Sequence, residues 1–229
     1  MNYRFIRLFL IVLILIVFPY SEAMAQRPQG KHIVIIDAAH GGTDFGVQLT
    51  SKEHEKNVTL AIALLIKKEL DKSGNIQANL TRTADIDVSL SERKNVISAA
   101  RSEIFVSIHV NAGFSKNSTG YELYFPGFKS TKEDKSDSKA IIRDMTRNKY
   151  LNESVKLARL IEKNMGGVFP RKSRDLRNAP ITVLEGVSIP AVVLEIGFAT
   201  NADDRKKMLE ENTQSAIAHA LSQSIKDFF

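Results

Sequence analysis

Short apolar runs alternate along the chain with longer segments in which apolar residues recur at helical spacing. The short runs predict strands at 33–36, 76–83, 104–110, 120–125 and 190–198, and a further short strand at 182–184. The longer segments predict helices at 58–70, 91–101, 141–165 and 202–229, whereas residues 171–180 are basic and typical of a turn. Because strands alternate with helices, we expect an α/β fold, a single domain with a mixed, mostly parallel sheet and helices on both faces.

The first 25 residues have the features of a secretory signal peptide. Arg4 and Arg7 precede an apolar run at 8–18, and Ala23-Met24-Ala25 is typical of a cleavage site. The run is short for a membrane span, and an uncleaved membrane anchor is the alternative interpretation. We therefore expect a signal peptide at 1–25, a linker at 26–30 and a folded domain at 31–229, with export to the periplasm or cell envelope.

Composition narrows the range of partners. The chain has 229 residues, a formal net charge of +6 and no cysteine, which excludes disulfides and a cysteine-linked lipid anchor. A basic balance suits either nucleic acid or an anionic polymer of the cell envelope. Because an exported protein meets little nucleic acid, we expect an anionic wall or membrane surface as the partner, and no nucleic acid.

The strand at 33–36 runs directly into a polar, glycine-rich turn, Asp37–Gly46, which contains His40. In open α/β sheets, ligands bind at the edge where the carboxyl ends of the strands lie. The sequence therefore predicts that this turn forms part of a binding site.

Three further side chains have the chemistry to complete such a site. His109 and Glu195 lie near the ends of two later strands, and Glu55 lies in the first turn of the first long helix. Two imidazoles and a carboxylate suit a catalytic zinc ion with one open position, and a further carboxylate can take a proton from water. Taken singly, each has an ordinary interpretation as a structural histidine or solvated carboxylate, although an acid such as Glu195 inside an apolar strand is costly unless paired.

The order of these residues resembles that of the zinc-dependent N-acetylmuramoyl-L-alanine amidases, the type-3 amidase family of cell-wall hydrolases. The resemblance covers the chain from about Lys31 to Phe229 and is carried by the segments 37–46, 55–61, 80–82, 90–93, 107–112 and 190–198, with Asn201. It implies an α/β sandwich that hydrolyses the amide between N-acetylmuramic acid and the first L-alanine of the stem peptide in peptidoglycan. One departure is Ala39, where the family usually has glycine, and alanine would be strained there if φ were positive.

The resemblance also implies a role for each of the four residues. His40, Glu55 and His109 would bind one Zn²⁺ per chain. Glu195 would act as the general base, and later as the acid that protonates the leaving amine.

Neighbouring residues are candidates to support this site. Asp37 or Asn111 could orient a histidine through a hydrogen bond, with local turn capping as the alternative. His54 precedes Glu55, but the two side chains diverge at a helix start, so we expect Glu55 to face the metal.

Two other functions stay open at this point. One is a non-catalytic peptidoglycan-binding regulator on the same fold, which a missing ligand would favour, but all four positions are filled. The other is a zinc peptidase of different specificity. Because no separate wall-binding module is visible in the sequence, targeting would come from the catalytic domain or a partner. We expect a monomer that acts on peptidoglycan.

The segment Lys129–Leu151 has two interpretations. Some members of the family carry an insertion here whose helix blocks the zinc site until an activator protein displaces it, and a polar loop followed by Ile141, Ile142 and Met145 is compatible with such a regulatory insertion. The alternative is a mobile surface loop.

Overall fold

The protein is described by a computed structural model covering residues 31–126, 138–169, 173–179 and 181–229. The expected signal peptide at 1–25, the linker at 26–30 and the polar loop before residue 138 lie outside the described residues. Residues 31–229 cluster as one unit. Within the described part of the chain, no helix is both long enough and apolar enough to cross a membrane.

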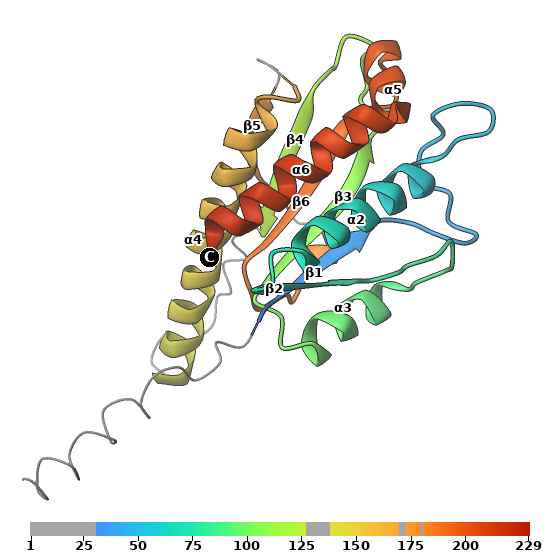
Figure 1. The fold of residues 1–229 in the computed structure, drawn as a ribbon. Helices are drawn as coiled ribbons and strands as arrows, with labels where there is room; N and C mark the ends of the chain where they lie inside the picture. The colour runs from blue at the N-terminus through green and yellow to red at the C-terminus, as the bar shows by residue number, and fades with distance from the viewer. Residues whose placement is uncertain (1–30, 127–137, 170–172, 180) are drawn as a thin grey trace, which may run out of the picture. The chain divides into compact units, whose positions relative to one another are not determined.

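Within the described residues, six strands form one mixed sheet in the order β2-β1-β3-β6-β4-β5 (Figure 1). Four neighbouring pairs of these strands are parallel, and β4 and β6 pair antiparallel. The predicted mixed, mostly parallel sheet is thus confirmed. The strands are β1 (His32–Ala38), β2 (Ile76–Leu80), β3 (Ile104–Asn111), β4 (Tyr121–Pro126), β5 (Ser173–Ala179) and β6 (Ala191–Phe198).

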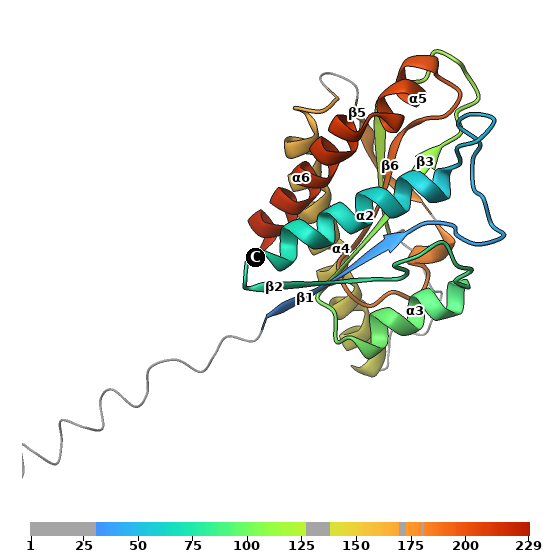
Figure 2. The same ribbon diagram turned by 45° about the vertical axis from the view of Figure 1, so that its right-hand side comes forward.

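Helices cover both faces of this sheet, as predicted (Figure 2). Val34 and Ile36 of β1 pack in the larger core with α2, α4 and α6, whereas Ile35 points into a smaller core with α3 and a short 3-10 helix. This alternation follows from the two-residue period of a strand. The helices are α2 (Glu55–Asp71), α3 (Leu90–Ala99), α4 (Ser138–Met165), α5 (Ala202–Leu209), α6 (Glu211–Phe228) and the 3-10 helix η2 (Thr182–Leu184).

Three predictions about elements were wrong. Residues 182–184 form the 3-10 helix η2 rather than a strand, and residues 173–179 form the edge strand β5 rather than a turn. The predicted helix at 202–229 is interrupted at Glu210, whose extended backbone (φ −81°, ψ 124°) ends α5 and precedes α6.

The helix predicted at 91–101 begins at Leu90, one residue earlier than predicted. Ser89 is its N-cap, and the Ser89 side chain accepts a hydrogen bond from the backbone N–H of Glu92. The Glu92 carboxylate accepts in return from the backbone N–H of Ser89 at 2.7 Å. This reciprocal capping box satisfies two backbone donors, which explains why the helix begins at Leu90.

The strand register gathers the candidate residues at one edge of the sheet. Ala38 at the end of β1 pairs with Ile108 of β3, and His109 of β3 pairs with Glu195 of β6. Because β1, β3 and β6 are parallel, their carboxyl ends meet at the same edge, where His40 follows β1.

The regulatory interpretation of Lys129–Leu151 stays a prediction. Its described part forms the first half of α4, where Ile142 and Met145 are exposed. Figures 1 and 2 show these turns away from the carboxyl ends of β1 and β3.

The capping box generates a stability prediction. Replacing Ser89 with alanine removes the side-chain acceptor, and we expect a loss of about 1 kcal/mol in the free energy of unfolding. Urea unfolding followed by circular dichroism measures it. The matched variant Ser91→Ala should change stability by less than about 0.5 kcal/mol, and equal losses in the two variants would contradict the assignment of the cap.

Candidate metal centre and active site

The loop after β1 presents His40 through an uncommon backbone conformation. His40 has φ of 61°, and Gly41, Gly42 and Gly46 also have positive φ. Gly41 and Asp44 exchange backbone hydrogen bonds of 2.9 and 3.1 Å, which closes a tight turn. The strain that we considered at Ala39 is absent there, because the chain turns into the left-handed region one residue later.

Glu55 is held in place by the backbone of two separate segments. It begins α2 and its side chain is 1% exposed. One carboxylate oxygen accepts from the N–H of Val110 at 2.8 Å, and the other accepts from the N–H of Val47 at 2.9 Å. These two bonds fix the orientation of a carboxylate whose burial would otherwise be costly.

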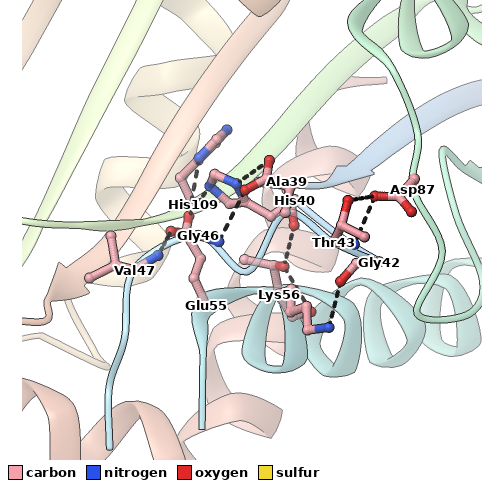
Figure 3. Close-up of polar contacts among 12 residues, drawn as sticks. Ala39, His40, Gly42, Thr43, Gly46, Val47, Glu55, Lys56, Asp87 and His109 are labelled. Atoms are coloured by element: carbon pink, nitrogen blue, oxygen red, sulfur yellow. Dashed lines mark hydrogen bonds and ion pairs between the residues drawn. The ribbon is translucent and has the colours of Figure 1, made fainter.

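His40, Glu55 and His109 converge on one point (Figure 3). His40 Nε2 and His109 Nδ1 each lie 3.2 Å from the same oxygen, Glu55 Oε1. The two rings are 5.3 Å apart at their centroids and nearly perpendicular. One potential ligand atom from each residue lies within 4.8 Å of the others, so the three can face a single ion.

The neighbours of Glu55 lie elsewhere. The ring of His54 packs against Phe45, with 5.0 Å between ring centroids. The carboxylate of Glu53 accepts from the side chain of Asn57. Of these adjacent residues, Glu55 is the one that belongs to the three-residue cluster.

The cluster is electrostatically coupled. Burial acts to raise the pKa of Glu55, but hydrogen bonds from His109 and His40 outweigh it and lower the pKa to about 2. Burial acts to lower the pKa of His40, but Glu55 and Asp44 outweigh it and raise the pKa to about 9. The protein thus maintains an ionised carboxylate and strongly attracts positive charge at this point.

Asp44 is a site residue that the sequence reasoning missed. Its carboxylate lies 2.8 Å from His40 Nδ1, which places a proton on Nδ1 and leaves Nε2 directed toward Glu55. A carboxylate behind a histidine in this way fixes the tautomer and orientation of a metal-binding ring. The available signal was an acid four residues after His40 in a turn rich in glycine.

Asp37 and Asn111 occupy different positions from the ones expected for residues that orient a histidine ring. Asp37 is buried, pairs with Arg93, and accepts from Thr81 and Ser107 at 2.7 and 2.6 Å. Asn111 donates its side-chain N–H to Glu122 at 2.7 Å. The hydrogen bonds of these two side chains therefore run to the surroundings of the cluster, and Asp44 is the residue that holds the His40 ring.

Glu195 lies on β6, across the ladder from His109. Its pKa is raised to about 7, first by burial, which the charge of His109 partly offsets, and then by the nearby charges of Glu55 and Glu122. Its Oε2 atom is buried and has no hydrogen-bond partner among the described residues. A carboxylate in this state can exchange a proton near neutral pH.

Glu122 was also missed, because a single acid in a short strand is an unremarkable signal. It is buried on β4 and pairs with Glu195 in the antiparallel ladder. Its carboxylate accepts from Asn111 and Tyr124, and the Arg177 guanidinium lies 3.4 Å away. Burial, followed by the contact with Glu122, raises the pKa of Tyr124 to about 12.

The donor set fits a divalent metal ion. Two imidazole nitrogens and a buried carboxylate oxygen are ligands that zinc accepts, and three protein ligands leave a position for water or substrate. Both histidine rings already meet the same carboxylate oxygen. The fold and this cluster together fit a metal-dependent hydrolase, and the carboxylate of Glu195 lies on the strand that pairs with the one carrying His109.

Comparison with known proteins agrees with this class. The profile of the N-acetylmuramoyl-L-alanine amidase family matches residues 34–227, so the chain belongs to this family. The predicted family and enzyme class are thereby confirmed.

Named relatives and solved structures support the assignment. The N-acetylmuramoyl-L-alanine amidase AmiA of Escherichia coli K12 is 27% identical, over 92% of this chain and 80% of the relative. The catalytic domain of the amidase CwlV from Bacillus (Paenibacillus) polymyxa var. colistinus has a TM-score of 0.69 at 28% identity, covering 86% of this chain and 97% of that domain. The CwlD amidase of Clostridioides difficile, solved in complex with the GerS lipoprotein, has a TM-score of 0.70 at 26% identity, with 86% and 98% covered.

The contact between Asp44 and His40 generates a prediction. Asp44→Asn removes the negative charge behind the ring, so we expect the affinity of the protein for Zn²⁺ to fall roughly 10- to 100-fold. Competition with a chromophoric chelator measures this affinity. Asp87→Asn is the matched control, because the Asp87 carboxylate accepts hydrogen bonds from the backbone N–H and the hydroxyl of Thr43 in the same loop, rather than from a histidine. Equal losses in both variants would show that loop integrity, rather than ring orientation, is responsible.

Proposed function

We propose that this amidase is an exported zinc enzyme that cleaves the amide bond between N-acetylmuramic acid and L-alanine in peptidoglycan. His40, Glu55 and His109 would hold one zinc ion, and Glu195 would be the general base. The observation that carries the proposal is the convergence of both imidazoles on the buried carboxylate of Glu55, with ligand atoms from all three residues within 4.8 Å of one another.

A bound zinc ion would lower the pKa of a water molecule and polarise the substrate carbonyl. The contribution of the protein is to orient the ligands in advance. Asp44 keeps the Nε2 edge of the His40 ring directed at the cluster, where loss of its proton would expose a lone pair to a metal ion. The N–H groups of Val47 and Val110 hold Glu55 in a single orientation. The site therefore needs little rearrangement to take up an ion.

Glu195 supplies the proton transfers in this proposal. Its carboxylate takes a proton from the attacking water and passes it to the amine nitrogen of L-alanine as the amide bond breaks. A pKa of about 7 suits both steps, because the group is then neither too weak a base nor too weak an acid at neutral pH. The absence of a described protein partner at Oε2 is consistent with a role in which that atom contacts water.

The proposal includes location and partners. Export rests on the signal-peptide features of residues 1–25, and a periplasmic or envelope location follows from them. The solved CwlD structure contains the GerS lipoprotein. We propose, on this ground, that the chain also binds a partner protein while acting on peptidoglycan as a monomer. The family resemblance, rather than that complex, suggests that the segment 129–151 inhibits the site until such a partner displaces it.

One assay on the purified protein without residues 1–25 tests the enzyme mechanism. We expect about one zinc per chain and release of free stem peptides from peptidoglycan. Glu195→Gln should lower the rate of release roughly 10²- to 10⁴-fold while zinc content stays unchanged, since only the proton acceptor is lost.

The control for this variant is Glu211→Gln at an exposed position of α6, which should leave both quantities unchanged. Zinc without amide cleavage in the wild-type protein would contradict the enzyme mechanism. Cleavage of another bond in the stem peptide would indicate the peptidase alternative.

The raised pKa of Glu195 generates a pH prediction. Its carboxylate is ionised above its pKa, so kcat/KM should fall as the pH drops below about 7. This fall is the acidic limb of the pH profile. Because a bound cation favours the ionised form of Glu195, the midpoint of this limb should lie at or below about pH 7. Glu122→Gln removes a negative charge that raises the pKa of Glu195, so the limb should move to lower pH. A limb that moves upward in Glu122→Gln, as measured by pH profiles of both proteins, would contradict this account.

A further inference from the structure

Two buried arginines lie directly beneath the loop that presents His40. Arg82 follows β2 and Arg93 lies on α3, and both are buried. The mechanism proposed above gives them no role. Their side chains reach the backbone carbonyls of three consecutive residues, Ala38, Ala39 and His40.

We propose that Arg82 and Arg93 are positioning residues for the metal centre, because they hold the backbone of His40 in the conformation that aims its ring at Glu55. This inference rests on the proposed role of His40 as a metal ligand. The two side chains would act through backbone carbonyls and would touch neither the ion nor the substrate.

Arg93 donates hydrogen bonds to the backbone on both sides of Ala39. Its Nη1 donates to the carbonyl of Ala38 at 2.9 Å, and its Nη2 donates to the carbonyl of His40 at 2.9 Å. The same guanidinium pairs with Asp37, which Thr81 and Ser107 hold in turn. Asp37 is therefore linked to the backbone of His40 through Arg93. The sequence suggested a direct hydrogen bond between Asp37 and a histidine ring, whereas the structure shows this indirect link.

Arg82 connects the same loop to the helix that carries Glu55. Its Nε donates to Ala38 at 3.0 Å, and its Nη2 donates to Ala39 at 3.0 Å and to the carbonyl of Lys56 at 2.7 Å. Lys56 directly follows Glu55, so Arg82 ties together the backbones that carry two of the three candidate ligands. A side chain at Gly41 would lie only 3.0 Å from Arg82, which shows how closely the loop rests on this guanidinium.

The loop needs such contacts for two physical reasons. Its carbonyls lie at and beyond the end of β1, and a buried carbonyl without a donor is unfavourable. In addition, a φ of 61° at His40 is disfavoured for a residue with a side chain, so the surrounding structure must impose it. A guanidinium supplies several donors in a rigid plane, whereas a lysine supplies one small ammonium group that cannot span the same carbonyls.

The experiment uses the purified protein without residues 1–25 and measures its affinity for Zn²⁺ by chelator competition, together with its thermal unfolding temperature. Arg93→Lys and Arg82→Lys each keep the positive charge but remove the planar guanidinium group and its several N–H donors. We expect each to weaken Zn²⁺ binding roughly 10- to 100-fold at a temperature well below unfolding. The absorption spectrum of the Co²⁺-substituted protein should also change, because it reports the arrangement of the ligands.

Arg205→Lys is the matched control. Arg205 also donates to a backbone carbonyl, that of Ala199 at 2.6 Å, but this contact lies beyond β6 and outside the His40 loop. Its zinc affinity and Co²⁺ spectrum should match those of the wild type, even if its unfolding temperature falls.

The decisive comparison combines Arg93→Lys with His40→Ala. If Arg93 acts through His40, Arg93→Lys should cause no further loss of Zn²⁺ affinity in a protein that already carries His40→Ala. Should Arg93→Lys fail to fold, Arg82→Lys with His40→Ala is compared in the same way, and there the added loss should shrink rather than vanish, because Arg82 also contacts the carbonyl of Lys56. Unchanged zinc affinity in the folded arginine variants, or the same loss with and without His40, would overturn the inference. If His40→Ala alone binds zinc as tightly as the wild type, the proposed metal role of His40 fails, and the inference fails with it.

Discussion

The whole site depends on a carboxylate that is buried and still charged. Glu55 is stable in that state because two backbone N–H groups and two imidazoles surround it. These partners come from the loop after β1 and from the end of β3, while the acid itself begins α2. The contacts that stabilise the buried charge are therefore the same contacts that bring the three candidate metal ligands together.

Much of this arrangement is predictable from the sequence, for a clear physical reason. The strands β1, β3 and β6 are buried on both faces and appear as nearly continuous apolar runs. His40, His109 and Glu195 are polar interruptions at or just beyond the ends of those runs, and parallel strands bring such ends to one edge. Glu55 needed the family resemblance, because an acid in the first turn of a helix is common in any protein.

The remainder depends on contacts that leave no periodic trace. The strand β5 is polar and lies at the edge of the sheet, so no alternation marks it. Ser89 and Ser91 are both possible caps, and Ser89 caps the helix because Glu92, three residues later, can bond back to its backbone N–H. Asp44 acts on His40 only because the glycine turn folds it back onto the ring. In each case a short-range geometric match, rather than hydrophobic pattern, decides the outcome.

The antiparallel strand β4 has a consequence for how the site could diversify. Because β4 runs against β6, its first residues lie beside the last residues of its neighbour, and Glu122 faces Glu195 directly. If β4 ran parallel to β6, the last residues of β4, rather than the first, would lie beside Glu195. The reversal places Glu122 beside the proposed base, so a substitution at Glu122 would change the surroundings of Glu195 without replacing any of the candidate metal ligands. The paired strands β4 and β6 thus offer a position at which sequence variation could change the site, whereas in most enzymes such variation occurs in loops.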